Sequence, residues 1–288
     1  MFKKATAVVR KLFGDNRIDI RFAPQPLHKP AQPKRGYFAL EAWTMRQQKQ
    51  KRRLSPSLSV ETEMPAILFD LDGTLVDSNY QHVNAWSETL LAAGLVIPRW
   101  KIHRRVGMSG RSMLQELLRE LGDTQGRIDL DQLERQHDSR FRRAIPHLKP
   151  LPGVNQLLSH LSRHGIRFAI ATTGGREQTL RLLKRLKVPA RMPVVTGDDV
   201  KRAKPSPDIF AAAARQLNAA MSDCIVVGDS VWDLLAAVRQ SALGVGFLSG
   251  GYGQEELERA GAFRVYSDAA DMLMHIEQLG LPGSERED

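Results

Sequence analysis

The sequence predicts an α/β fold, in which helices cover both faces of a parallel sheet and an all-helical cap domain is inserted after the first strand. Two observations lead to this prediction. Short apolar segments alternate with amphipathic segments through residues 150–282, a pattern typical of a parallel sheet between two layers of helices. Residues 79–149 contain only helix-like segments, without a convincing strand, which indicates an inserted helical domain.

The individual elements are expected where apolar runs are bounded by turn residues. The expected strands are Ala66–Phe69, Arg167–Ala171, Pro193–Val195, Cys224–Val227, Gly244–Phe247 and Phe263–Tyr266. The expected helices between the later strands are Gly153–His164, Arg176–Leu186, Pro207–Leu217, Val231–Gln240, Gln254–Ala260 and Ala269–Leu279. Three further helices are expected near residues 79–93, 111–121 and 130–144. A sheet of this kind is Rossmann-like.

The domain organisation follows from these patterns. Residues 64–78 and 150–282 are expected to form the core, residues 79–149 the inserted cap, and residues 283–288 a frayed tail. Residues 1–63 lack sustained periodicity and several prolines interrupt them, so we expect a basic, disordered leader with a short amphipathic helix near its start.

Charge is distributed unevenly along the 288 residues, which carry a net charge of +10. Residues 1–64 hold 14 of the 42 Lys and Arg residues but only 5 of the 32 Asp and Glu residues, so the remainder is nearly neutral. A single cysteine, Cys224, excludes an intrachain disulfide and a cysteine-built zinc cluster. No apolar run reaches the ~20 residues that span a bilayer. We therefore expect a cytoplasmic protein without a membrane partner.

Reactive side chains follow four of the expected strands. In an open parallel sheet, ligands bind outside the carboxyl ends of the strands. The candidate residues there are Asp70, Asp72, Thr172, Thr173, Lys204, Asp229 and Asp233. Because Asp70 and Asp229 would repel each other without a cation between them, and because Mg²⁺ prefers hard oxygen ligands, these residues favour a Mg²⁺ site that also receives a phosphate.

Four motifs at these positions resemble those of the haloacid dehalogenase superfamily, whose members use an aspartate as nucleophile in phosphoryl transfer. The motifs are Asp70-Leu71-Asp72-Gly73-Thr74, then Thr172, then Lys204 within Lys204-Pro205-Ser206-Pro207-Asp208, and finally Gly228-Asp229-Ser230 with Asp233. The resemblance covers residues 64–280. The helical insertion between the first two motifs is similar to the branch that contains phosphoglycolate phosphatases and β-phosphoglucomutases.

This resemblance implies a Mg²⁺-dependent phosphatase that acts on a small phosphorylated metabolite. Asp70 would attack phosphorus and form an aspartyl-phosphate, and Asp72 would protonate the leaving oxygen and then activate water. Phosphate binding is implied for Thr172, Thr173 and Lys204, and metal binding for Asp70, Asp229, Asp233 and the backbone carbonyl of Asp72.

The cap residues are expected to determine the substrate. Arg104, Arg105 and Arg111 lie in a basic, glycine-containing stretch that either contacts the distal part of an anionic substrate or is a solvated connection between helices. His82 and Trp86, near the start of the cap, are expected to pack rather than to act in catalysis.

Several alternatives stay open at this point. A β-phosphoglucomutase-type phosphotransferase would use the same scaffold. The basic run in residues 46–53 suggests nucleic-acid or surface binding, although no recognition fold is evident and nucleic acid is not an expected partner. Two other interpretations of the leader stay open. It is a targeting segment, or it is not translated because translation starts at Met64. The residues alone identify neither the physiological substrate nor the oligomeric state.

Overall fold

The computed structural model describes residues 64–283, except for residues 123–127, 185, 187 and 190–191. All of these residues belong to one compact unit. The expectations for the leader, residues 1–63, and for residues 284–288 lie outside the described residues.

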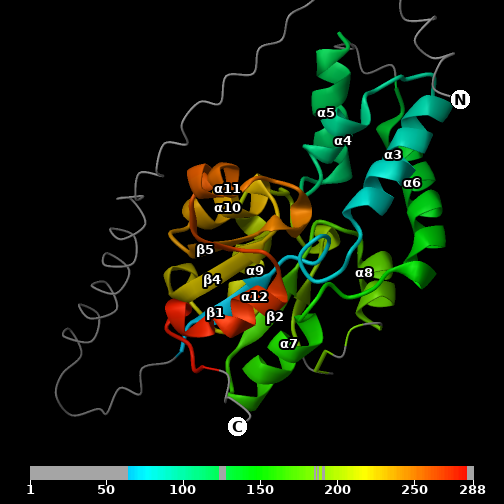
Figure 1. Cartoon of the computed structure of the whole chain (residues 1–288). Coiled ribbons are helices and arrows are strands. Elements are labelled where there is room, and N and C mark those ends of the chain that lie inside the picture. The colour runs from blue at the N-terminus through cyan, green and yellow to red at the C-terminus, as the bar shows by residue number, and fades with distance from the viewer. Residues whose placement is uncertain (1–63, 123–127, 185, 187, 190–191, 284–288) are drawn as a thin grey trace, which may run out of the picture. The chain divides into compact units, whose positions relative to one another are not determined.

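Six parallel strands form a single sheet in the order β3-β2-β1-β4-β5-β6 (Figure 1). The strands are β1 (Ala66–Phe69), β2 (Phe168–Ala171), β3 (Val194–Val195), β4 (Cys224–Gly228), β5 (Leu243–Phe247) and β6 (Ala262–Tyr266). The predicted fold class is confirmed, and each predicted strand lies within one residue of its observed bounds. In the register, Phe69 pairs with Ile170 of β2 and with Val227 of β4. Residues that follow these three strands are therefore brought to one edge of the sheet.

Ten helices occur among the described residues. They are α3 (Asn79–Ala92), α4 (Arg99–His103), α5 (Gly110–Glu120), α6 (Leu130–Ala144), α7 (Val154–Arg163), α8 (Arg176–Leu183), α9 (Asp208–Gln216), α10 (Val231–Val238), α11 (Gln254–Ala260) and α12 (Ala269–Met274). Short 3-10 helices, η1 (Ile145–His147), η2 (Gly197–Asp199), η3 (Met221–Asp223), η4 (Leu248–Gly250) and η5 (Ile276–Leu279), lie between them.

Alternation along the strands builds a core on each face of the sheet, because successive side chains of a strand point to opposite faces. Ile67 and Phe69 of β1 pack in one cluster with α7, α8 and α12. Ala66 and Leu68 pack in the other, with α9 and α10. All four side chains are fully buried, and burying one Leu, Ile or Phe contributes about 1.5–3 kcal/mol.

The observed helices differ in number from the expected ones at two points. The single helix predicted over residues 269–279 is divided into α12 and η5, because His275 leaves the helical conformation with φ −119°. Helix α4 was not predicted, since five residues after Pro98 are too few to show a helical period.

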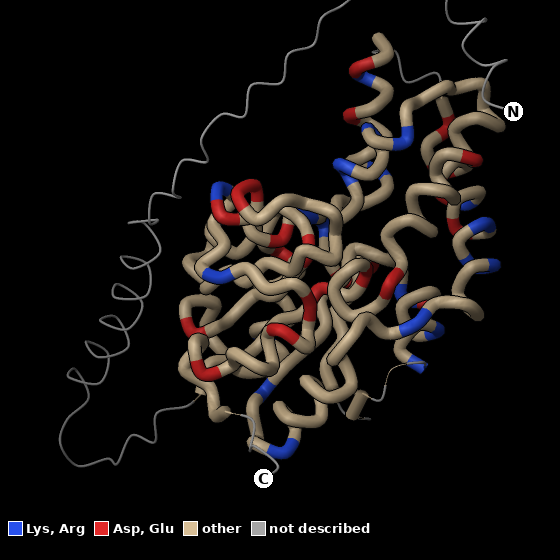
Figure 2. Tube along the Cα trace, viewed as in Figure 1, with Lys and Arg blue, Asp and Glu red and all other residues tan. Residues whose placement is uncertain are grey.

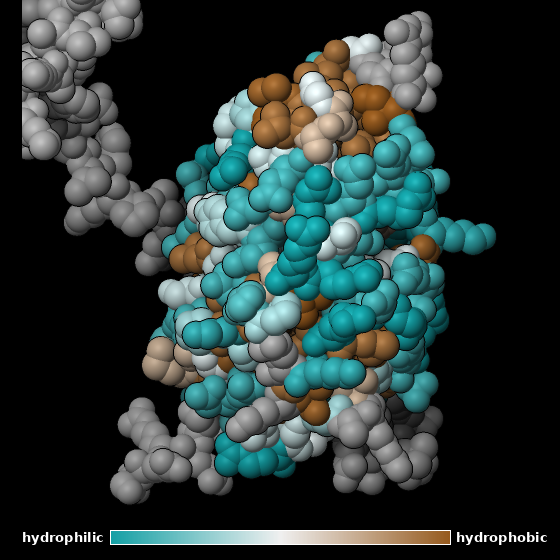
Figure 3. Space-filling view, turned by 90° about the vertical axis from the view of Figure 1, so that its right-hand side faces the viewer, coloured by the Kyte–Doolittle hydropathy of each residue, from teal (hydrophilic) through white to brown (hydrophobic). Residues whose placement is uncertain are grey.

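The inserted helices α3–α6 form the cap around a small core of their own. This core is made of Val83, Trp86, Leu90, Ile102, Met113, Leu114, Leu117 and Leu133. Leu91, Val96 and Trp100 of the cap are exposed, and apolar surface gathers at the top of the molecule in Figure 3. Lys and Arg are interspersed with Asp and Glu over the described core and cap (Figure 2). Within this part of the chain, no helix has the length and apolarity needed to cross a bilayer.

Candidate active site

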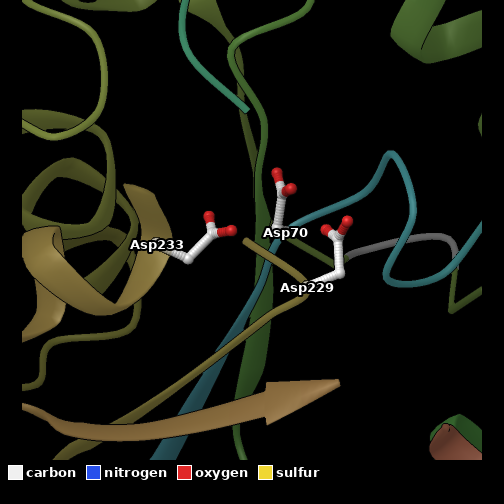
Figure 4. A group of neighbouring side chains, drawn as sticks. All are labelled: Asp70, Asp229 and Asp233. Carbon is white, nitrogen blue, oxygen red and sulfur yellow. The ribbon is translucent and has the colours of Figure 1, made fainter. Parts of the chain in front are cut away.

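Three aspartates converge at the carboxyl edge of the sheet (Figure 4). Asp70 follows β1, Asp229 follows the neighbouring β4, and Asp233 lies in the first turn of α10. One carboxylate oxygen from each lies within 4.8 Å of the others, and all three residues are buried. Sequence positions more than 150 residues apart therefore meet because their strands are adjacent.

Lys204 connects two of these carboxylates. Its Nζ lies 2.5 Å from Asp70 Oδ1 and 2.8 Å from Asp233 Oδ1, and its side chain is fully buried. Burial alone would lower the pKa of Lys204, but the carboxylates of Asp233 and Asp70 outweigh it and raise the pKa above its ordinary value. The lysine is thus a permanent cation within the acidic cluster.

The cluster still has fewer positive than negative charges. Burial raises the pKa of Asp70 well above its ordinary value, even against the opposing charge of Lys204. Burial, with the charge of Asp233, raises the pKa of Asp229 to about 7. Three neighbouring buried carboxylates, two of which contact the single ammonium group of Lys204, are a donor set that fits a hard divalent cation.

Asp229 is held by two residues that the sequence analysis did not single out as ligands or partners. Thr74 Oγ1 donates to Asp229 Oδ1 at 2.9 Å, and Asn79 Nδ2 donates to Oδ2 at 2.7 Å. Gly73 makes room for them: it has φ +77°, and a Cβ there would lie 2.3 Å from Asp229 Oδ2. The only available signal was closeness in sequence, since both donors lie within ten residues of Asp70.

Asp233 has a structural and an electrostatic task. Its Oδ2 accepts hydrogen bonds from the backbone N–H and the hydroxyl of Ser230, which closes a capping box at the start of α10. Its Oδ1 faces Lys204. The helix cap therefore fixes the carboxylate that orients the lysine.

Asp72 lies beside the cluster and is oriented by the first turn of the cap. Its Oδ1 accepts a hydrogen bond from Ser78 Oγ at 2.6 Å and lies 3.2 Å from His82 Nε2, while Oδ2 is 3.4 Å from Thr172 Oγ1. Burial would raise the pKa of Asp72, but His82 and Ser78 outweigh it and hold the pKa below its ordinary value. His82 packs as predicted, with its ring stacked on Phe141 at 3.7 Å between the centroids, and it also contacts Asp72.

His82 also begins a chain of contacts inside the cap. Its Nδ1 lies 3.1 Å from His137 Nε2, and His137 Nδ1 lies 3.0 Å from Asp138 Oδ1. Trp86 stacks on His137 with 4.1 Å between the ring centroids, which agrees with its predicted packing role. Burial lowers the pKa of His137 to about 4, so this ring is neutral at pH 7.

The two predicted threonines have different surroundings. Thr172 is 1% exposed, and its hydroxyl accepts a hydrogen bond from the backbone N–H of Gly174 at 3.1 Å. The hydroxyl of Thr173 donates to the carbonyl of Met108 in the cap at 3.3 Å. Thr173 thus contributes a contact between core and cap.

A cavity of about 410 Å³ lies between the core and the cap. We call its core side the core wall and its cap side the cap wall. The charged and hydroxyl side chains of the core wall are Asp70, Asp72, Thr172, Thr173, Asp198 and Lys201. Those of the cap wall, counting the histidines, are His82, Arg105, Ser109, Glu134, His137 and Asp138. The volume is in the range of small-molecule sites.

The three predicted cap arginines do not gather at this cavity. Only Arg105 lines it. Each guanidinium is paired with nearby carboxylates: Arg104 with Glu256, Arg105 with Glu116 and Glu120, and Arg111 with Asp131 and Glu134. The arginines are thus neutralised by other residues of the chain.

Comparisons with known proteins agree with this architecture. Residues 64–239 match the family model for haloacid dehalogenase-like hydrolases. The crystal structure of a hydrolase from Pseudomonas syringae is 44% identical, with a TM-score of 0.71, and the match covers 75% of this chain and 99% of that one.

The curated relatives include phosphatases and a mutase. Hexitol phosphatase A of Escherichia coli (strain K12) is 32% identical over 171 residues, which are 59% of this chain and 77% of that protein. Beta-phosphoglucomutase of Bacillus subtilis (strain 168) is 27% identical over 220 residues, 74% of this chain and 95% of that protein. A bifunctional riboflavin kinase/FMN phosphatase of Arabidopsis thaliana is 28% identical over 186 residues, but the match spans only 48% of its length.

Proposed function

This chain belongs to the haloacid dehalogenase-like hydrolases, and from that premise we propose that it is a Mg²⁺-dependent phosphatase that hydrolyses a small phosphomonoester. The observation that carries the proposal is the buried cluster of Asp70, Asp229 and Asp233 around Lys204, from which Asp70 also reaches the cavity. A carboxylate that is both nearly buried and open to a ligand pocket is suited to act on a phosphoryl group.

Asp70 is proposed as the nucleophile. One of its carboxylate oxygens forms a bond to phosphorus as the bond to the ester oxygen breaks, which leaves an aspartyl-phosphate. Water then attacks the same phosphorus, inorganic phosphate leaves, and the Asp70 carboxylate is restored. Lys204 faces Asp70 at 2.5 Å and can stabilise negative charge on the phosphoryl oxygens, as can the hydroxyl of Thr172 and, in our proposal, that of Thr173.

Asp72 is proposed as the general acid and base. It gives its proton to the leaving ester oxygen in the first step and takes a proton from water in the second. Ser78 and His82 hold its carboxylate next to the cavity. A bound phosphoryl group adds negative charge nearby, which raises the pKa of Asp72 and favours its acid form for the first step.

The proposed metal ligands are the side chains of Asp70, Asp229 and Asp233 together with the backbone carbonyl of Asp72. When bound, Mg²⁺ supplies positive charge that offsets the repulsion between these carboxylates and an incoming phosphate. Thr74 and Asn79 keep Asp229 turned toward Asp70.

The test is phosphate release by the purified full-length chain from a panel of phosphorylated metabolites. We expect release that EDTA abolishes and that added Mg²⁺ restores. Release that continues unchanged in EDTA would exclude the metal-dependent mechanism. Lack of release from every phosphomonoester of the panel, with Mg²⁺ present, would exclude the phosphatase.

A phosphotransferase of the β-phosphoglucomutase type is the second candidate, favoured by a match that covers 95% of such a relative. Incubation with β-glucose 1-phosphate and a sugar bisphosphate separates the two functions. Inorganic phosphate without isomerised sugar supports the phosphatase, and isomerised sugar supports the mutase.

We also propose domain bounds and a compartment. Residues 64–78 and 150–282 form the catalytic core in this proposal, and residues 79–149 form the cap. A cytoplasmic location is supported by the single cysteine, Cys224, which is buried as a free thiol.

A further inference from the structure

A series of hydrogen-bonded side chains crosses the cap and ends in the core on both sides. Its middle members are His82 of α3 and His137 and Asp138 of α6, two helices that lie side by side (Figure 1). Its ends in the core are Asp72 and Gln178 of α8. All five residues line the cavity. The proposed chemistry uses Asp72, with His82 as its support, and gives the other three no role.

The hydrogen bonds of this series run in one direction. The carboxylate of Asp138 can only accept, so His137 Nδ1 donates to it across 3.0 Å. Burial lowers the pKa of His137 to about 4, so its neutral ring has no hydrogen left for Nε2. His82 Nδ1, which lies 3.1 Å from that nitrogen, therefore donates to it. The Nδ1–H of His82 is thus committed to His137, and Nε2 faces Asp72 Oδ1 at 3.2 Å.

Asp138 is held from the core as well as from the cap. Burial would raise the pKa of Asp138, but hydrogen bonds from His137 and from the side-chain amide of Gln178 outweigh it and hold the pKa below its ordinary value. Gln178 is itself buried in the first turns of α8. The carboxylate therefore joins a cap histidine to a helix of the core, beside the cavity.

Apolar contacts fix the planes of both imidazole rings but not the positions of their nitrogens. Trp86 stacks on His137 with 4.1 Å between the centroids, and Phe141 stacks on His82 with 3.7 Å. Packing alone would need only two flat apolar rings here. Instead, all four ring nitrogens have a polar partner, which selects one orientation of each ring.

Resting on the proposed phosphatase function, we infer that Asp138 and His137 are positioning residues for the general acid and base. Asp138 orients His137, and His137 orients His82. His82 then holds Oδ1 of Asp72, which leaves Oδ2 to exchange a proton with the ester oxygen and with water. The cap thus contributes to proton transfer through residues that do not touch the reacting atoms.

The test compares two aryl phosphates that differ in how much the leaving oxygen needs a proton. Phenolate is a much stronger base than p-nitrophenolate, so phenyl phosphate depends more on a general acid. His137→Phe keeps a flat ring beside Trp86 but removes both hydrogen bonds, and Asp138→Leu removes the terminal acceptor. With Mg²⁺ present, we expect each variant to lose at least about tenfold in kcat/KM for phenyl phosphate, but about threefold or less for p-nitrophenyl phosphate.

The ratio of the two kcat/KM values is the decisive readout. Misfolded protein lowers both values alike, so the ratio does not depend on how much of a variant is folded. Asp131→Leu is the matched control, because Asp131 also belongs to α6 but is not among the described residues that line the cavity. This variant should keep the wild-type ratio.

The outcomes separate this inference from the proposed function. Mg²⁺-dependent hydrolysis of p-nitrophenyl phosphate by the wild type, with an unchanged ratio in either His137→Phe or Asp138→Leu, overturns the inference and leaves the phosphatase standing. A change of ratio in Asp131→Leu as large as that in Asp138→Leu overturns it as well. Failure of the wild type to hydrolyse both aryl phosphates and every metabolite of the panel overturns the inference and the proposed function together.

Discussion

The core wall and the cap wall face one cavity, but they are built in different ways. The reactive residues of the core follow neighbouring strands, so the hydrogen-bond register of β1, β2 and β4 sets their positions. Most of the cap wall consists of side chains from α3 and α6, whose places depend on how the cap helices pack around Trp86. A rigid sheet edge suits chemistry that tolerates little displacement, whereas a separate helical layer can vary without disturbing it.

The two walls also differ in how their charges are satisfied. The core side holds three carboxylates close to Lys204, and this excess of negative charge is the basis of the metal site that we propose. The cap pairs its own charges, as in the contacts of Arg105 with Glu116 and of Arg111 with Glu134. We therefore expect substitutions on the core side to abolish turnover and substitutions in the cap to change selectivity.

The largest effect is expected for Asp70→Asn. An amide cannot form the aspartyl-phosphate, so turnover should fall by about 10⁴-fold or more, as for other enzymes that lose the nucleophile. Asp77→Asn is the control, because Asp77 is exposed and lies in the same connection between β1 and α3. Steady-state phosphate release by both variants at the wild-type rate would refute the role of Asp70.

Lys204→Met should be the next most severe change. It removes the cation that contacts both Asp70 and Asp233, so we expect turnover to fall by roughly 10²–10³-fold, as when one oxyanion donor is lost. The free energy of unfolding measured in EDTA should also fall, by about 3 kcal/mol, because two buried carboxylates lose their counterion. Lys149→Met, at an exposed lysine, should change neither quantity; equal losses in both variants would contradict the assignment.

The core wall and the cap wall also differ in how far the sequence predicts them. Asp70, Asp229 and Lys204 could be placed together because parallel strands present their carboxyl ends at one edge. The contact of His82 with His137 could not be predicted, since it joins α3 to α6 across 55 residues and depends on cap packing. Helix α4 was missed for a related reason: five residues carry no period, and tertiary contacts of Ile102 hold it in place.

When metal is absent, a change in pH should alter the stability contributions of Asp229 in the core and of His137 in the cap in opposite directions. Burial and Asp233 raise the pKa of Asp229 to about 7, so the folded protein keeps a proton that the unfolded chain loses above pH ~4. The free energy of unfolding then falls as pH rises toward 7, by up to about 4 kcal/mol. Burial lowers the pKa of His137 to about 4, so the unfolded chain binds the extra proton up to pH ~6.5. The contribution of His137 to the free energy of unfolding therefore increases as pH rises, by up to about 3 kcal/mol.

Single variants separate these two contributions. In EDTA, the free energy of unfolding of Asp229→Asn should rise more, or fall less, between pH 5 and pH 7 than that of the wild type. The free energy of unfolding of His137→Phe should fall more, or rise less, over the same range. Urea unfolding at the two pH values measures both slopes. Added Mg²⁺ should stabilise the wild type more at pH 7 than at pH 5, because the ligands are then deprotonated. Identical slopes in the two variants would show that neither group controls the pH dependence.

The smallest effects are expected where the cap meets the core near α4. Arg104 and Glu256 form an ion pair across this contact, but both side chains are more than one-third exposed, at 39% and 44%. The backbone carbonyl of Arg104 also accepts hydrogen bonds from Tyr252 Oη at 2.8 Å and from Trp232 Nε1 at 3.3 Å. Tyr252 is buried, so we expect its hydrogen bond to stabilise this contact more than the exposed ion pair does.

Tyr252→Phe should therefore lower the free energy of unfolding by about 1 kcal/mol, since it removes one hydrogen bond and leaves a carbonyl of the cap with a weaker partner. A double-mutant cycle of Arg104→Gln and Glu256→Gln should give a coupling energy below about 1 kcal/mol that decreases with added salt. Urea unfolding at low and high salt measures both quantities. A coupling energy larger than the effect of Tyr252→Phe would mean that the ion pair, rather than the hydrogen bonds to the backbone carbonyl of Arg104, holds the cap against the core. Charge would then stabilise the cap as well as the core side, which would contradict the difference argued above.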